Sequence, residues 1–261
     1  MTPSDREYFS NKSLSKSAID LLLECPARYK AIMDGDVDEE KDSDALRFGS
    51  MCHLLVLEPE LFETQYVSTD LNLATKEGKA FKEEVLQSGR EIVKDKDYER
   101  ALYMADAVRS HWQVEVLFNN PHVCEQPVYW TYNSVPCKAK PDIVSVLPDG
   151  RRIIGDLKTT DSANPAHCEK SIMKYKYYRQ AAWYLSGMEF SGQPCDAFVF
   201  IFVEKTRPHL ITCYEMSPEA LNLGMKECDK AVEILKDCQS KNLWPCYTRD
   251  ILTFKLPDWA A

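Results

Sequence analysis

The chain has 261 residues, of which 44% are apolar and 28% are charged, which excludes a disordered protein and allows a substantial core. No apolar run is long enough to span a membrane and the first ten residues are polar, so we expect a soluble, cytoplasmic protein with no membrane partner. The net charge of −9 is uneven, because residues 34–44 hold seven acids and one lysine and the remainder carries −3. We interpret that acidic run as a solvated loop, so an anionic partner stays possible for the rest of the chain.

Four helices are expected in the first 120 residues. A short capped helix is expected where Leu14-Ser15-Lys16-Ser17 precedes an apolar stretch at 18–23 that ends near Cys25-Pro26. Three further helical patterns cover residues 45–57, 76–88 and 95–117. Strand patterns rich in Val, Ile, Phe and Tyr then occur at 126–132, 136–146, 152–159, 197–204 and 209–216. Helices are expected between and after them, at 165–186 and 218–239. The simplest packing is one α/β domain over residues 1–261, with a helical layer at 1–120 and a mixed sheet flanked by helices at 121–261.

The segment between residues 139 and 158 predicts a β-hairpin with two acidic residues facing each other. Its turn is Pro148-Asp149-Gly150, which fits a three-residue loop because proline cannot donate to the ladder and glycine accepts a left-handed backbone. Pairing Leu147 with Arg151 then sets Asp142 opposite Asp156. Lys158, two residues further on, points to the same face.

Opposed carboxylates on one sheet face repel each other unless a cation lies between them. A divalent metal with oxygen ligands removes this repulsion, and a neighbouring protonated lysine can hold a metal-bound water. The hairpin by itself also fits a plain solvated face with scattered charges.

Three other parts of the sequence carry side chains suited to binding. His53 lies one turn after Gly49 in an apolar helix, where a histidine is by default a hydrogen-bonded core residue. Gln180 and Tyr184 are four residues apart and share a helix face, which suits a phosphate or a routine polar stripe. Residues 164–180 hold four basic residues and one glutamate with three interleaved tyrosines, a composition typical either of nucleic-acid contact or of an ordinary charged helix face.

The ten cysteines are scattered and include no C-x-x-C pair, which disfavours a disulfide framework and a structural zinc site. We interpret most as buried thiols in a reducing compartment. An iron–sulfur cluster on Cys25, Cys238 and Cys246 is the minor alternative, since no close pair anchors it.

Taken together, the motifs resemble the RecB-type branch of the PD-(D/E)xK nucleases, and within it the RecE (exonuclease VIII) nuclease domains. They occur in the order Cys25-Pro26, Gly49-x-x-x-His53, Pro141-Asp142, Asp156-x-Lys158 and Gln180-x-x-x-Tyr184, and span roughly residues 14–185. The chain departs from the commoner motif by having Asp rather than Glu at 156. It also lacks the closely spaced C-terminal cysteines of the cluster-bearing members.

The resemblance implies roles for individual residues. The metal, Mg²⁺ with Mn²⁺ as a substitute, would be bound by Asp142, Asp156, the carbonyl of Leu157, His53 and, as a candidate, Glu125. The catalytic residues would be Lys158, Asp142, Asp156, His53, Gln180 and Tyr184. Lys158 would position or activate the attacking water, and Gln180 and Tyr184 would contact the DNA phosphate near the scissile bond. Basic residues expected to contact DNA are Lys140, Lys174, Lys176 and Arg179.

The resemblance further implies a 5′-to-3′ exodeoxyribonuclease that acts on double-stranded DNA ends and leaves 3′ single-stranded tails for homologous recombination. It implies a homo-oligomeric ring, a tetramer, with a single-strand annealing recombinase of the RecT type as a possible partner. Two alternatives stay open: an endonuclease of the same fold, and a catalytically silent DNA-binding module. A linear duplex incubated with and without Mg²⁺ separates them.

Overall fold

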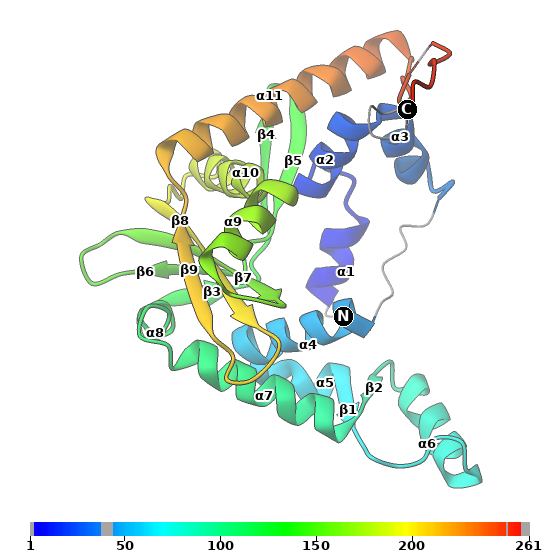
Figure 1. Ribbon diagram of the computed structural model, residues 1–261, viewed down its shortest axis with the longest axis vertical. Helices are drawn as coiled ribbons and strands as arrows, with labels where there is room; N and C mark the ends of the chain where they lie inside the picture. The colour runs from blue at the N-terminus through cyan, green and yellow to red at the C-terminus, as the bar shows by residue number, and fades with distance from the viewer. Residues whose placement is uncertain (1–2, 38–43, 249, 257–261) are drawn as a thin grey trace.

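A five-stranded mixed sheet forms the centre of the computed structural model, which describes residues 3–37, 44–248 and 250–256 (Figure 1). Its strand order is β3-β6-β7-β8-β9, with β7 and β8 parallel and the other neighbours antiparallel. The strands are β3 (His122–Cys124), β6 (Ile143–Val146), β7 (Arg152–Thr160), β8 (Ala197–Glu204) and β9 (Ile211–Glu215).

Helices cover both faces of this sheet. One face packs against α4 (Asp44–Leu57), α7 (Asp95–Arg109) and α8 (Glu115–Phe118). The other packs against α9 (Pro165–Lys174) and α10 (Tyr177–Phe190), which form the crossover from β7 to β8. The expected α/β fold, a mixed sheet flanked by helices with a mainly helical N-terminal region, is confirmed.

The N-terminal and C-terminal helices form a third packed region beside α10. There α2 (Lys16–Glu24) and α11 (Pro218–Lys241) pack against α10 and against the hairpin of β4 (Val128–Tyr132) and β5 (Val135–Ala139). Helices α1 (Pro3–Ser10) and α3 (Pro26–Asp34) flank α2 along the chain.

The remaining elements lie near the ends of α4 and α7, with α6 at the extremity of the molecule (Figure 1). They are η1 (Pro59–Leu61), α5 (Phe62–Gln65), β1 (Tyr66–Ser68), α6 (Lys76–Gln87) and β2 (Glu91–Val93). In the described part of the chain, no helix combines the length and the apolarity needed to cross a bilayer.

Strand β7 alternates cleanly between the two faces. Ile153 and Leu157 pack in the core under α4 and α7, whereas Ile154 packs with the strand β8 phenylalanines under α9 and α10. Because side chains alternate along a strand, Asp156 and Lys158 share the face of Ile154 and point toward α10. This face assignment determines which helix can complete the site.

The predicted hairpin has the predicted register. Val146 pairs with Arg152 and Ile143 with Gly155, which continues to Asp142 opposite Asp156. The N–H of Leu147 donates to the carbonyl of Arg151 at 2.8 Å. Gly150 has φ of 89°, the left-handed residue that the three-residue loop requires.

The single strand predicted for residues 136–146 is wrong. It is divided into β5, which pairs with β4, and β6, which pairs with β3 and β7. The break falls at Lys140-Pro141-Asp142, where Pro141 has no N–H to give to a ladder. The three-residue strands β1, β2 and β3 were not expected, because a segment of three residues is too short to show an alternation of apolar and polar side chains.

Helix prediction failed mainly at the ends and breaks of helices. The helix expected at 165–186 is interrupted between Lys174 and Tyr177, where Lys176 has φ of 55°, and the one expected at 95–117 is interrupted between α7 and α8. Pro26, expected to end a helix, instead occupies the first turn of α3, where its missing N–H costs nothing. The expected helix cap is confirmed, and the structure assigns it to Ser15, whose hydroxyl accepts from the N–H of Ala18. Most of the acidic run, residues 38–43, lies outside the described residues.

Candidate functional site

The site begins at Asp142, where β6 has not yet started. The ladder between β6 and β7 ends at the pair Ile143–Gly155, and beyond it the N–H of Leu157 donates to Asp142 Oδ2 at 2.7 Å. The Asp142 side chain therefore completes the ladder, which fixes a buried carboxylate at the edge of the hairpin.

His53 reaches the same carboxylate from the opposite layer. It lies on α4, and its Nδ1 is 3.5 Å from Asp142 Oδ2. The imidazole is also hydrogen-bonded to the backbone of Leu157. Burial and the Lys158 ammonium hold the pKa of His53 below its usual value, and the neutral imidazole that results is the form that ligates a metal.

Glu125 is the third member and follows directly after β3. Its backbone has φ of 52°, and its N–H donates to the carbonyl of Asp142 at 3.0 Å. Its carboxylate is paired with Lys140. Ligand atoms of His53, Glu125 and Asp142 lie within 4.8 Å of one another, so one ion placed among them can touch all three.

The carboxyl groups of this cluster hold protons unusually tightly. Burial and the charge of Asp142 raise the pKa of Glu125 to about 7. Burial and the charge of Asp156 likewise raise the pKa of Asp142. Burial is the larger cause of both shifts and the neighbouring carboxylate the second, and the lysines lower these pKa values without cancelling the rise, so a divalent cation would stabilise the buried negative charge. The residues present therefore fit a metal ion.

Asp156 and Lys158 form the second part of the site, on the α10 side of the sheet. The Asp156 side chain is 1% exposed, and its Oδ1 is 2.5 Å from Lys158 Nζ. Its Oδ2 accepts from the amide of Gln180 on α10. Burial would lower the pKa of Lys158, but the charges of Asp156 and Asp142 together outweigh it, so the shift is upward and the lysine is held as an ammonium.

A groove of about 500 Å³ is lined in part by Gln180, the residue whose amide bonds to Asp156. Gln180, Tyr184 and Lys140 line one part of it, and the chain between Tyr8 and Ser17 lines another. Burial raises the pKa of Tyr184 well above its usual value, so its hydroxyl stays a hydrogen-bond donor. The polar stripe predicted on α10 thus faces both the acidic residues and an open groove.

The structure brings together seven predicted residues: His53, Glu125, Asp142, Asp156, Lys158, Gln180 and Tyr184. Leu157 contributes its N–H and its hydrogen bond to His53. Sequence reasoning missed the groove residues Lys12, Lys16 and Lys138, because they lie in a short loop, a helix start and a strand with no motif of their own.

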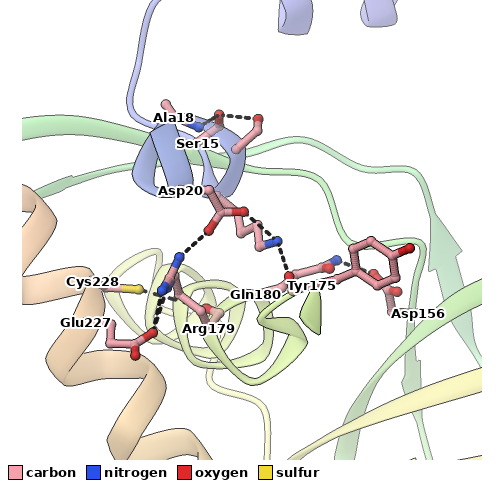
Figure 2. Close-up of polar contacts among 11 residues, drawn as sticks. Ser15, Ala18, Asp20, Asp156, Tyr175, Arg179, Gln180, Glu227 and Cys228 are labelled. Carbon is pink, nitrogen blue, oxygen red and sulfur yellow. Dashed lines mark hydrogen bonds and ion pairs between the residues drawn. The ribbon is translucent and has the colours of Figure 1, made fainter. Parts of the chain in front are cut away.

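The four residues expected to contact DNA are placed very differently. Lys174 is exposed and Lys176 is half-buried at the junction of α9 and α10, while Lys140 lines the groove beside Glu125. Arg179 is buried and bonds to Asp20 on α2 and Glu227 on α11 (Figure 2). Its guanidinium thus ties three helices together, and Arg179 is not among the residues that line the groove.

In the described part of the chain, His53, Glu125 and Asp142 are the one group of three or more histidine, cysteine or acidic ligand atoms this close together. Cys25, Cys238 and Cys246 do not form such a group. Burial raises the pKa of Cys238, which does not favour a thiolate.

Comparison with known families decides the relationship of this chain. Residues 15–256 match the PDDEXK-like domain of unknown function (DUF3799). The chain belongs to this family. The sequence contains the pattern that this name describes, Pro141-Asp142 followed by Asp156-x-Lys158. This match shows the PDDEXK-like family and does not test the finer resemblance to RecE nuclease domains.

Among solved structures, the chain is similar to a candidate exonuclease from Eubacterium rectale, with a TM-score of 0.66, 14% identity, and coverage of 98% of this chain and 96% of that one. This similarity shows a shared fold. A phage-related exonuclease from Haemophilus somnus 129PT is more distant, with a TM-score of 0.39, 13% identity, and coverage of 88% and 96%. A comparison with curated proteins gives no match.

Proposed function

We propose that this protein is a metal-dependent exodeoxyribonuclease that degrades double-stranded DNA from its ends. The observation that carries the proposal is the convergence of His53, Glu125 and Asp142 within 4.8 Å, beside the buried Asp156–Lys158 pair. A shared fold with a candidate exonuclease supports the same reaction class. A silent scaffold gains nothing from burying carboxylates that repel one another, which argues against that alternative.

The residues divide into a metal-holding group and a water-handling group. His53, Glu125 and Asp142 would hold the ion, with Asp156 and the Leu157 carbonyl as further ligands. When bound, Mg²⁺ or Mn²⁺ would supply Lewis-acid polarisation of a phosphate oxygen and stabilise developing negative charge.

Lys158 would position the attacking water. Its ammonium is fixed by Asp156 and lies 4.9 Å from the ring centre of Tyr177, so it has little freedom to move. Gln180 holds the other Asp156 oxygen and would orient that carboxylate. Tyr184 and Lys140, on the groove side, would contact the phosphate beside the scissile bond.

The polarity, the product and the assembly belong to the same proposal. We propose 5′-to-3′ degradation that leaves 3′ single-stranded tails for recombination, in a tetrameric ring, with a RecT-type annealing protein as partner. The resemblance to RecE nuclease domains supports these features. A closed ring would also let an acidic chain surround DNA with its positive charge confined to the channel.

The deciding experiment compares linear duplexes labelled at the 5′ or the 3′ end with a covalently closed circle, in Mg²⁺ and in EDTA. Early release of the 5′ label from linear DNA only, and only with Mg²⁺, is expected. Cutting of the circle would establish an endonuclease instead. Binding of the duplex without any cutting in Mg²⁺ would establish a silent DNA-binding module.

A further inference from the structure

Tyr175 is an exposed aromatic residue at the junction of α9 and α10, with 48% of its surface accessible. Its ring stacks on Tyr177, with centroids 5.6 Å apart and planes inclined by 30°. Tyr177 stacks in turn on Phe200, at 5.2 Å and 28°. The three rings form a column that leads from the surface to the Lys158 ammonium, which lies 4.9 Å from Tyr177 and 5.6 Å from Phe200.

The backbone that presents Tyr175 is held in an uncommon conformation. Lys176 has φ of 55°, a left-handed geometry that a non-glycine residue adopts only when its surroundings impose it. In a continuous helix, the carbonyl of Tyr175 would accept from the N–H of Arg179. Here that N–H bonds to the carbonyl of Lys176 instead.

Lys16 bonds to the carbonyl of Tyr175, which has lost its usual helical donor. Its ammonium donates to Tyr175 O at 2.9 Å and pairs with Asp20 at 2.7 Å, and Asp20 also bonds to Arg179 (Figure 2). The break in the helix is therefore secured by side chains from α2 and α10. Local strain that is maintained in this way beside a reaction centre points to a use for the residue it presents.

Ammonium groups lie beside the two outer rings of the column. Lys174 Nζ is 4.9 Å from the ring centre of Tyr175, and Lys16 Nζ is 6.0 Å from that of Tyr177. An exposed ring beside lysines is the combination that binds single-stranded nucleic acid, since the base stacks on the ring and its phosphates meet the cations.

We propose that Tyr175 stacks an unpaired nucleobase of the strand whose phosphate lies at Lys158. This inference rests on the proposed nuclease function and deepens it. A base inside a duplex is already stacked on both faces, so the enzyme engages a frayed end in which one base has left the helix. Tyr177 is a positioning residue, because it links the stacked base to the ammonium of Lys158.

The test is a chemical double-mutant cycle. Tyr175→Ala and Tyr175→Phe are combined with duplexes that carry a single abasic nucleotide at each of the three terminal positions. Tyr103→Ala, which removes an exposed tyrosine on α7, is the matched control. Affinity is measured by fluorescence anisotropy in EDTA, and KM and kcat are measured in Mg²⁺.

We expect Tyr175→Ala to weaken binding and raise KM by about tenfold, within the range for losing one base–aromatic stack, with a much smaller effect on kcat. One abasic position should cost the normal protein a similar factor and cost Tyr175→Ala almost nothing. Tyr175→Phe and Tyr103→Ala should behave as the normal protein does.

Independent, additive effects of Tyr175→Ala and every abasic position would overturn the inference. That result together with normal cleavage would leave the proposed nuclease function standing. Coupled losses of affinity in EDTA without any cleavage in Mg²⁺ would do the reverse, since they would support the stacking site and reject the nuclease. Failure to bind DNA at all would overturn both.

Discussion

Two charged clusters lie on either side of α10, and neighbouring residues of that helix belong to different ones. Arg179 joins the first cluster, defined by Lys16, Asp20, Arg179 and Glu227. Gln180 reaches the second, defined by Glu125, Lys140, Asp142, Asp156 and Lys158. We refer to them as the Arg179 cluster and the acidic cluster.

The two clusters differ in charge balance. The Arg179 cluster has two cations and two carboxylates in contact, so it needs no further ion. The acidic cluster has three carboxylates and two lysines, and burial together with the charge of Asp142 raises the pKa of Glu125 to about 7. A balanced cluster serves architecture, whereas an unbalanced one is incomplete until a cation or a proton arrives.

The largest effect is expected at Asp142. Asp142→Asn keeps an oxygen for the N–H of Leu157 but removes the charge, so cleavage in Mg²⁺ should fall by roughly 10³-fold or more. The metal-free protein should be equally or more stable in urea, because the neutral amide removes the cost of burying an ionisable carboxyl group beside Asp156. Asp149→Asn, in the exposed turn of the same hairpin, should change neither activity nor stability. Normal cleavage by Asp142→Asn would remove Asp142 from the reaction.

The reverse pattern is expected at Arg179. Arg179→Met removes the guanidinium from Asp20, which keeps Lys16, and from Glu227, which keeps only the Tyr178 hydroxyl. It should lower the free energy of unfolding by about 2 to 3 kcal/mol, less than for a fully buried pair, since those carboxylates are 34% and 29% exposed. Urea denaturation measures this loss. The kcat per folded molecule should change by less than about tenfold. Arg151→Met, which breaks an exposed pair, is the control and should change stability by less than about 0.5 kcal/mol. Equal stabilities of the two variants would contradict the bracing role.

A smaller effect is expected from pH, which should change the stability of the metal-free protein through the acidic cluster. The folded protein keeps a proton on Glu125 up to about pH 7, whereas the unfolded chain releases it near the usual 4.5. The folded state therefore binds more protons in this window, and the stability of the metal-free protein should fall by about 2 kcal/mol as pH rises through it.

Urea titrations in EDTA between about pH 5 and pH 8 measure this slope, and Glu125→Gln should flatten it in part while the Asp142 contribution remains. Saturating Mg²⁺ should restore stability most at the alkaline end, where protons compete least for the carboxylates. Stability that increases with pH in EDTA would show that the acidic cluster is already balanced.

The sequence determined the local features whose physical causes are short-range. The turn Pro148-Asp149-Gly150 fixed the hairpin register, because proline and glycine each leave few positions that they can occupy. The helix cap within residues 14–17 and the helical and strand regions followed from patterns within one or two turns. The order of the motifs was enough to predict the fold, and with it the set of polar residues that gather at the hairpin.

Tertiary structure decided which of those residues meet and what each is used for. Nothing local to residues 175–180 shows that Arg179 turns toward α2 and α11 while Gln180 turns toward Asp156, because the choice depends on partners supplied by distant segments. The break at Lys176 depends on Lys16, which lies far back in the chain and takes the carbonyl of Tyr175. The sequence therefore predicted which residue types are available, and long-range packing decided which of them meet. The reason is that a side chain's charge is a local property, whereas its desolvation and its partners depend on distant segments.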